Sequence, residues 1–383
     1  MRQTDLEINP EVMTVRAHAN GSCLSPKATW TNLLIYGAAH GAVDGTCAAV
    51  FFTLLYKHSI TTSNLFTYAI FYNVVAFGLR APFGLVVDYF RISRPAAALG
   101  CLLVASSAIT YSAMPLFALI VVGIGNALYH VGGGGISFNL VPKRAMPPGI
   151  FAAPGALGIG VGTVIGKTGH FIAWPFISLL LAFSLLMYTV QMPKMDCNQL
   201  EDRNTTHCFR LILLLALLSV AASSFIGLSL VFPWKSNQFL LIILTLAVFL
   251  GRGMGGFMAD RFGWLPVAVG TLLASIPLLA LGSQFPWVAM IGMILFNASV
   301  PVALTVISNL LPGRSSFAYG LASLALIIGG LFAFSRFQQA LTMPMFVATA
   351  ILIFALTLYA GLWLFYKNST QIEIAASSLN QKI

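Results

Sequence analysis

The sequence contains the stretch Arg80-Ala-Pro-Phe-Gly84-Leu-Val-Val-Asp88 and, 172 residues later, the stretch Arg252-Gly-Met-Gly-Gly256-Phe-Met-Ala-Asp260. Arginine, glycine and aspartate recur in both with the same spacing of four residues. A second pair, Asn139-Leu-Val-Pro-Lys-Arg144 and Asn309-Leu-Leu-Pro-Gly-Arg314, repeats at an offset of 170. Two matched pairs at nearly one offset predict that the chain is built from two copies of one unit.

The composition places these copies in a membrane. Of the 383 residues, 58% are apolar and 8% are charged, whereas a soluble domain carries about 25% charged residues. A soluble core of this size cannot hide so much apolar surface from water, and the same hydrophobicity excludes disorder. The net charge of +10 comes from dispersed loop residues, so we expect no nucleic-acid partner. The chain is predicted to be an all-α polytopic membrane protein.

Apolar runs alternate with brief polar breaks between residues 30 and 366. A spanning helix needs about 20 apolar residues, and dividing the region accordingly predicts twelve transmembrane helices. The predicted spans are 30–56, 64–87, 95–113, 116–141, 147–167, 170–191, 209–232, 237–259, 264–282, 286–311, 315–338 and 343–366.

One long polar break separates two sets of six spans. The predicted organisation is therefore a tail (1–29), a six-helix half (30–191), a central loop (192–208), a second six-helix half (209–366) and a second tail (367–383). An even number of spans lies between equivalent positions, so both copies face the same way. This is a parallel repeat about an axis along the membrane normal, and such proteins bind their substrates between the halves.

The distribution of Lys and Arg predicts the orientation. With the N-terminus in the cytoplasm, 14 of these residues lie inside and 4 lie outside, and two more lie within spans. Cytoplasmic loops carry the excess of positive charge, so both termini and the central loop are predicted to be cytoplasmic. We expect a monomer in the inner (plasma) membrane, in contact with the lipid bilayer.

The first predicted span contains a charged pair. Asp44 lies mid-span, four residues after His40, so the two share one helix face. A carboxylate inside a membrane is costly and is a functional-site hypothesis by default, and histidine titrates near neutral pH. The pair would hold or pass a proton; the alternative is a structural pair that joins this span to a neighbour.

The fourth predicted span repeats this spacing. Asn126 and His130 are four residues apart, Tyr129 lies between them, and glycines fill positions 132–135. Four consecutive glycines weaken a helix and let another backbone come close. The stretch would be either an unwound segment that faces a ligand or a packing surface.

The duplicated motif predicts a conformational latch. Arg80 and Asp88 lie two turns apart on one helix, and a carboxylate at a helix end can pair with loop arginines or with the N-terminus of a neighbouring helix. Such contacts would hold one conformation and break in another; the alternative is a static anchor. The predicted latch residues are Arg80, Gly84, Asp88, Arg144, Arg252, Gly256, Asp260, Arg261 and Arg314.

The motif resembles the signature of the major facilitator superfamily, Gly-x-x-(Ala)-Asp-(Arg/Lys)-x-Gly. The second copy, Gly256-Phe-Met-Ala-Asp260-Arg261-Phe-Gly263, matches well, and the first copy keeps the Gly84 and Asp88 spacing. The resemblance covers residues 30–366. It implies twelve helices in two six-helix halves and secondary active transport by alternating access.

A finer resemblance comes from the first and fourth spans. His-x3-Asp followed by Gly-x-Gly-x3-(aromatic)-His is similar to the fosmidomycin-resistance-type branch of that superfamily, and His40, Asp44, Tyr129 and His130 are among the matching residues. That branch usually continues with Pro-Glu after the histidine, where this chain has Val131-Gly132. The resemblance implies proton-coupled efflux of a small drug-like or anionic compound.

Other polar or aromatic residues of neighbouring spans are candidates for a substrate cavity: Tyr36, Tyr72, Asn73, Ser223, Asn297 and Arg336. Uptake or export of a metabolite uses the same architecture. His40, Asp44 and His130 would suit a first-row divalent metal if they converged, so metal transport is an alternative function. A non-transporting receptor is a more remote one. No HExxH helix and no GxSxG elbow occurs, so we expect neither an enzyme nor a cofactor; the proton gradient would supply energy.

Overall fold

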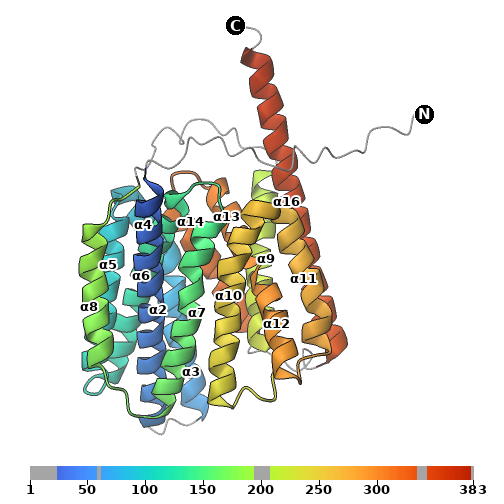
Figure 1. The fold of residues 1–383 in the computed structure, drawn as a ribbon. Helices are drawn as coiled ribbons and strands as arrows, with labels where there is room; N and C mark the ends of the chain where they lie inside the picture. Colours follow the sequence, from blue (N-terminus) through green and yellow to red (C-terminus); the bar gives the residue numbers. More distant parts are fainter. Residues whose placement is uncertain (1–23, 58–61, 194–207, 334–342, 381–383) are drawn as a thin grey trace.

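All regular elements in the described ranges are helices (Figure 1). The computed structural model describes residues 24–57, 62–193, 208–333 and 343–380. Ten helices are long and apolar enough to cross a membrane, and two shorter apolar helices, Trp174–Thr189 and Trp264–Ala280, lie where the sixth and ninth spans were predicted. Every predicted span coincides with a helical segment, which confirms the all-α polytopic fold.

The N-terminal half contains the elements α2 to α8. Several of these helices have a proline at their first or second position, where its fixed φ suits the first helical turn. The elements are α2 (Pro26–Lys57), α3 (Thr62–Asn73), the π-helix η1 (Val74–Gly78), α4 (Arg80–Phe90), α5 (Ser93–Thr110), α6 (Pro115–Leu140), α7 (Met146–Lys167) and α8 (Trp174–Thr189).

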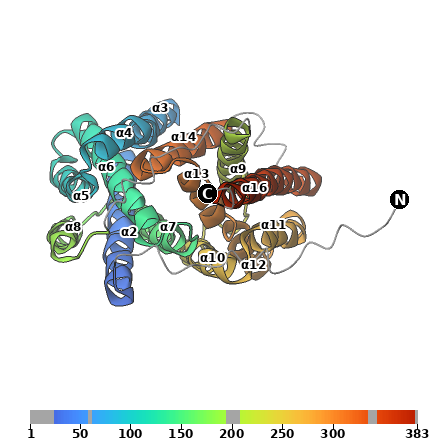
Figure 2. The same cartoon turned by 90° about the horizontal axis from the view of Figure 1, so that it is seen from above.

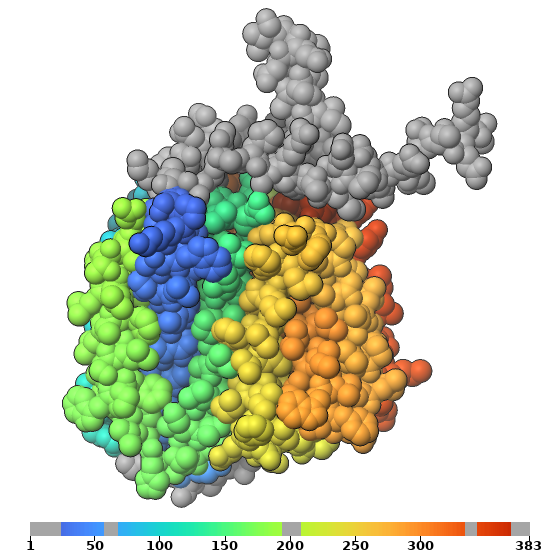
Figure 3. Space-filling model, in the orientation of Figure 1, coloured from blue at the N-terminus to red at the C-terminus, as the bar shows by residue number. Residues whose placement is uncertain are grey.

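The C-terminal half repeats this order. Its elements are α9 (Phe209–Ser229), α10 (Gln238–Phe262), α11 (Trp264–Ala280), α12 (Pro286–Asn297), α13 (Val300–Leu310), α14 (Ser315–Ala333) and α16 (Pro344–Asn380). Seen from above, the two halves form two groups of helices, with α7 beside α10 and α14 reaching toward α4 and α6 (Figure 2). The space-filling view also shows α7 (green) beside α10 (yellow), where the two halves meet (Figure 3).

Two predicted spans are interrupted. The second span passes from α3 through one turn of π-helix into α4, and the tenth divides between Asn297 and Val300. Pro301 explains the second break, because it cannot donate the backbone hydrogen bond of a continuous helix. The last helix also differs from the prediction, since α16 runs on to Asn380 through residues assigned to a polar tail.

The helix ends confirm the internal duplication. Arg91 after α4 and Lys143 after α6 adopt left-handed backbone conformations (φ 55° and 61°), and Gly263 and Gly313 adopt positive φ at the equivalent places of the second half (99° and 72°). Glycine takes this conformation without steric cost, whereas Arg91 and Lys143 pay about 1–2 kcal/mol each. Positive φ therefore recurs at equivalent positions of the two halves, although Gly263 (ψ 143°) is more extended than Arg91 (ψ 40°).

Candidate functional site

One cavity of about 590 Å³ lies between the two halves. Helices of both halves line it, and much of its wall is apolar, with Phe51, Phe77 and Leu326 among the residues. The polar and charged part of the wall is small and contains most of the predicted cavity residues. These are His40, Asp44, Tyr72, Asn73, Asn126, His130, Ser223 and Asn297, joined by Arg80, Arg252, Tyr319 and Ser323.

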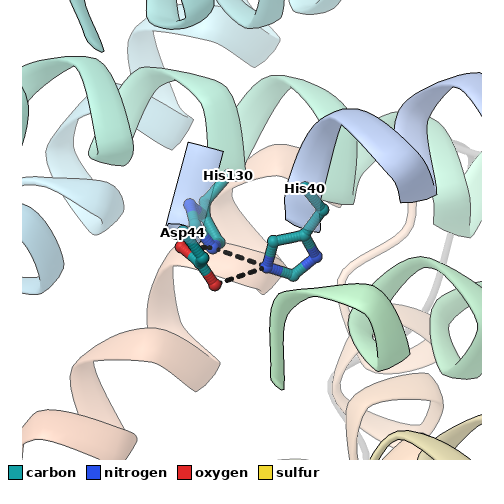
Figure 4. Close-up of side chains that lie close together, drawn as sticks. All are labelled: His40, Asp44 and His130. Carbon is teal, nitrogen blue, oxygen red and sulfur yellow. Dashed lines mark hydrogen bonds and ion pairs between the residues drawn. The ribbon is translucent and has the colours of Figure 1, made fainter. Parts of the chain in front are cut away.

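His40, Asp44 and His130 form a compact triad in this wall (Figure 4). His40 Nε2 lies 3.1 Å from Asp44 Oδ2, and His130 Nε2 lies 3.5 Å from Asp44 Oδ1. The two Nε2 atoms are 2.9 Å apart. Both histidines are 3% exposed, and the aspartate side chain is 12% exposed. The helical spacing of α2 and the packing of α2 on α6 thus gather the three titratable groups.

The outer ring nitrogens fix the tautomers of the histidines. His40 Nδ1 lies 2.7 Å from the carbonyl oxygen of Phe151, and His130 Nδ1 lies 2.8 Å from that of Asn126. A carbonyl only accepts, so each Nδ1 carries a hydrogen. Neutral rings would then point two lone pairs at each other across 2.9 Å. A proton shared between the two rings, next to the Asp44 carboxylate, would turn this contact into a hydrogen bond.

Asn126 connects this triad to Arg80. Its amide nitrogen donates to Asp44 Oδ1 at 3.0 Å, and its oxygen accepts from Arg80 Nη2 at 2.7 Å. Arg80 Nη1 also donates to Ser323 of the other half at 3.1 Å, and its guanidinium lies over the Phe77 ring at 4.1 Å. A polar chain therefore runs from the triad across the cavity to α14.

Arg80 and Arg252, which the sequence places within spans and in the predicted latch, lie on the cavity wall. Arg252 is partly exposed there and donates to the Ala152 carbonyl at 3.4 Å. Among the described residues, the Nε atoms of both arginines have no hydrogen-bond partner. Eight residues along a helix span about 12 Å, which separates each arginine from the aspartate of its own motif.

The two aspartates form matching contacts between the halves. Asp88 accepts from the backbone N–H groups of Ser316 and Phe317 at 3.0 and 2.8 Å, in the first turn of α14. Asp260 accepts from those of Ala145 and Met146 at 2.8 and 2.9 Å, at the start of α7. A carboxylate at a helix N-terminus satisfies N–H groups that have no partner within the helix. Of the two partners considered from the sequence, loop arginines and a helix N-terminus, the aspartates take the helix N-terminus.

The motif glycines permit this approach. A Cβ atom on Gly84 would lie 2.5 Å from the Ser316 carbonyl oxygen, and one on Gly256 would lie 3.0 Å from the Met146 Cα. The neighbouring basic residues form weaker contacts at these sites. Arg144 donates to the Asp260 carbonyl at 3.5 Å, Arg261 lies over the Phe262 ring, and Arg314 acts electrostatically on Asp88.

The glycine-rich stretch of α6 is a packing surface. The helix is continuous from Pro115 to Leu140, and a Cβ atom on Gly133 would lie 2.9 Å from the Phe151 ring. Gly134 and Gly135 face Tyr319 and Ser316 of α14. Of the two interpretations of this stretch, close packing is the one that the helix adopts.

Tyr36 and Tyr129 lie in the core of the N-terminal half rather than on the cavity. They are 1% and 0% exposed, and the Tyr129 hydroxyl donates to the Tyr36 carbonyl. Arg336 lies outside the described residues. The cavity residues that sequence reasoning missed are Tyr319 and Ser323; an aromatic and a serine in an apolar span carry no signal that separates lining from packing.

The triad meets the convergence that the metal-transport alternative requires, because one ligand atom of each of the three residues lies within 4.8 Å of the others. The guanidinium groups of Arg80 and Arg252 in the same wall repel a dication, which disfavours a metal ion as the occupant.

Comparison with solved structures identifies the fold. No family model and no curated protein matches the sequence. Two crystal structures of the E. coli fucose:proton symporter FucP are similar to the chain, both with a TM-score of 0.62. A variant matches at 13% identity over 87% of this chain and 99% of that chain, and a structure in the outward conformation at 15% over 88% and 97%.

A human protein is similar to the same degree. The organic anion transporter MFSD10 (TETRAN) matches with a TM-score of 0.68 and 15% identity, over 88% of this chain and all (100%) of that chain. The fosmidomycin-resistance-type branch stays a prediction from the sequence. The structural similarity over nearly the whole length of these transporters shows that the chain has the fold of the major facilitator superfamily.

Proposed function

We propose that this protein is a secondary active transporter that moves a small anionic compound by alternating access and couples the movement to protons. The observation that carries the proposal is the cavity between the halves, because its wall holds both a proton-binding triad and two arginines. The similar structures are of membrane transporters: two are structures of a fucose:proton symporter, and one is a structure of an organic anion transporter.

The contacts of Asp88 and Asp260 support alternating access. Both join one half to the other on the side of the membrane where α4 and α10 end. The cavity wall extends away from that side, as far as Phe52 near the end of α2 and Leu331 near the end of α14. Breaking both contacts would let the halves rock and expose the cavity on the side that is predicted to be cytoplasmic.

The triad supports proton coupling. Its two Nε2 atoms lie 2.9 Å apart, the separation of a hydrogen bond in which one ring is protonated at Nε2. Loss of the proton would leave two facing lone pairs and a carboxylate, which repel one another and loosen the packing of α2 on α6. Proton binding and local structure are thus linked at one point of the cavity wall.

The charge of the wall supports an anionic substrate over a divalent metal. Export of a drug-like compound is expected from the branch resemblance, and the direction of transport is a quantity that the assay below measures. Uptake of a metabolite anion would use the same cavity.

The test uses purified protein in proteoliposomes that contain a pH-sensitive dye. A panel of organic anions, antibiotics, amino acids and divalent metals is screened for substrate-dependent proton flux, with wild type compared with Asp44→Asn. Flux with an anion that is lost in the variant supports the proposal. Proton-coupled flux that persists in folded Asp44→Asn protein would refute the role of the triad.

A further inference from the structure

Arg80 and Arg252 occupy equivalent positions of the repeat and face one cavity from opposite halves. Arg80 is 3% exposed. In the described part of the chain, the ion pairs formed by carboxylates join Asp44 to His40 and His130, and neither arginine takes part in one. A buried charge without a counter-charge is strongly destabilising. The two guanidinium groups therefore lack a negative partner that a ligand would supply.

The two arginines share one electrostatic environment. Asp44 and Tyr319 act on both of them. The Nε–H of each is buried and has no hydrogen-bond partner among the described residues, and a guanidinium presents its donors in a fork that matches the two oxygens of a carboxylate or similar group. An oxyanion between them would satisfy donors of both halves at once.

The charges of the wall add up to a positive site. Two guanidinium groups against the single Asp44 carboxylate leave one net positive charge, and the proton of the histidine pair adds a second. Other titratable groups that face the triad are Cys47, Tyr72, Tyr129 and Tyr319. These thiol and phenol groups are neutral when protonated, so the proton of the pair is the variable charge.

We propose that Arg80 and Arg252 together hold one small organic oxyanion and that the proton of the His40–His130 pair binds cooperatively with it. The inference rests on the transport function proposed above and names its substrate class and coupling. A proton in the wall attracts an anion and repels a cation, and by linkage the anion raises the affinity for the proton by the same factor. The Asn126 amide, between Arg80 and Asp44, joins the two sites directly.

Cooperative binding sets the direction of coupling. A carrier that binds proton and anion together moves them together, whereas a carrier in which they compete exchanges them. Under an inward proton gradient, the first arrangement drives uptake. This outcome is opposite to the export implied by the branch resemblance, so the two can be separated by experiment.

The test is calorimetric titration of the full-length protein in nanodiscs with four probes of similar size. Benzoate and benzenesulfonate are permanent anions over the range from mildly acidic to mildly alkaline pH, benzamide is neutral and benzylamine is a cation. We expect the two anions to bind at millimolar concentration or better, with proton uptake measured in buffers of different ionisation enthalpy. Linkage of one proton to one anion lowers the affinity by up to about tenfold per pH unit as pH rises.

Arg252→Gln is the decisive variant, because among the described residues the Arg252 side chain forms one long hydrogen bond, at 3.4 Å. We expect it to lose at least tenfold in anion affinity, Arg252→Lys to lose less, and Arg210→Gln, at the exposed start of α9, to bind as wild type does. The proposal is overturned if no anion binds, if binding releases protons or is independent of pH, or if Arg252→Gln binds normally.

The flux assay in proteoliposomes and the titration in nanodiscs together separate the two proposals. Proton-coupled flux in protein whose anion binding releases protons would leave the transport function intact and remove cooperative binding. Anion binding with proton uptake but no flux would support the binding site and refute transport.

Discussion

Replacing Asp88 with asparagine tests how strongly the aspartate contacts hold the halves together. The carboxylate accepts two backbone hydrogen bonds from the first turn of α14, at 3.0 and 2.8 Å. Asparagine offers one oxygen, so one N–H group loses its acceptor, at a cost of about 1.5–3 kcal/mol for a bond to a charged group. Loss of the charge at a helix N-terminus costs about 0.3–1 kcal/mol more.

The sum, about 2–4 kcal/mol, predicts that the closed conformation loses roughly 30- to 900-fold in relative population, at 1.36 kcal/mol per factor of ten. Spin labels at Phe90 and Phe262, the exposed and equivalent ends of α4 and α10, report the distance between the halves on this side. The measurement is double electron–electron resonance in a chain whose native cysteines have been replaced.

We expect a second, longer distance in Asp88→Asn and the same change in Asp260→Asn, because its two bonds are equivalent. Tyr89→Asn is the matched control, since Tyr89 is the neighbour of Asp88 and is 82% exposed. Unchanged distances in both aspartate variants, in protein that remains folded, would refute the idea that these contacts close one side.

Three further predictions concern the cavity. Asp44→Asn should abolish proton-driven flux while leaving exchange without a gradient, measured in proteoliposomes; loss of both would point to misfolding or to a structural role. Gly155→Ala should lower flux at least tenfold, because its Cβ atom would lie 2.5 Å from His40 Nε2 and 2.7 Å from Asp44 Oδ2, whereas at Gly227 the nearest atom is 3.9 Å away and Gly227→Ala should transport normally. Alkylation of Cys47, which lines the cavity, should slow when benzoate is bound, as followed by mass spectrometry; an unchanged rate would place the anion elsewhere.

Much of the fold could be predicted from the sequence because apolar length and spacing are local properties. The spans and their duplication follow from residue counts, and a helix N-terminus was one of the two partners that the sequence offered to Asp88 and Asp260. His40 and Asp44 were predictable as neighbours because four residues make one helical turn.

What could not be predicted depends on contacts between distant helices. The π-helical turn at Val74–Gly78 changes the helical register just before Arg80, and the spacing of apolar residues in the sequence does not predict it. Tyr36 and Tyr129 look like cavity residues in sequence, yet the approach of α6 to α2 pairs them inside the core. Sequence reasoning grouped the arginines with the aspartates as latch residues because they share one motif, and the motif does not show that the arginines face the cavity.

Some functional residues occur in both halves of the repeat, and others occur in one half. Each half contributes one helix, α4 or α10, that carries an arginine in the cavity and an aspartate at the closed side. A ligand that draws the two arginines together therefore acts on the same rigid helices that make the contacts, and rocking needs no separate relay. The triad, by contrast, has no counterpart, because α9 and α13 contain neither histidine nor aspartate. The arginines and aspartates, which are present in both halves, suit a carrier that opens alternately to the two sides of the membrane. The triad, which is present in one half, suits proton coupling, since one proton-binding site is enough to make the two conformations differ in energy.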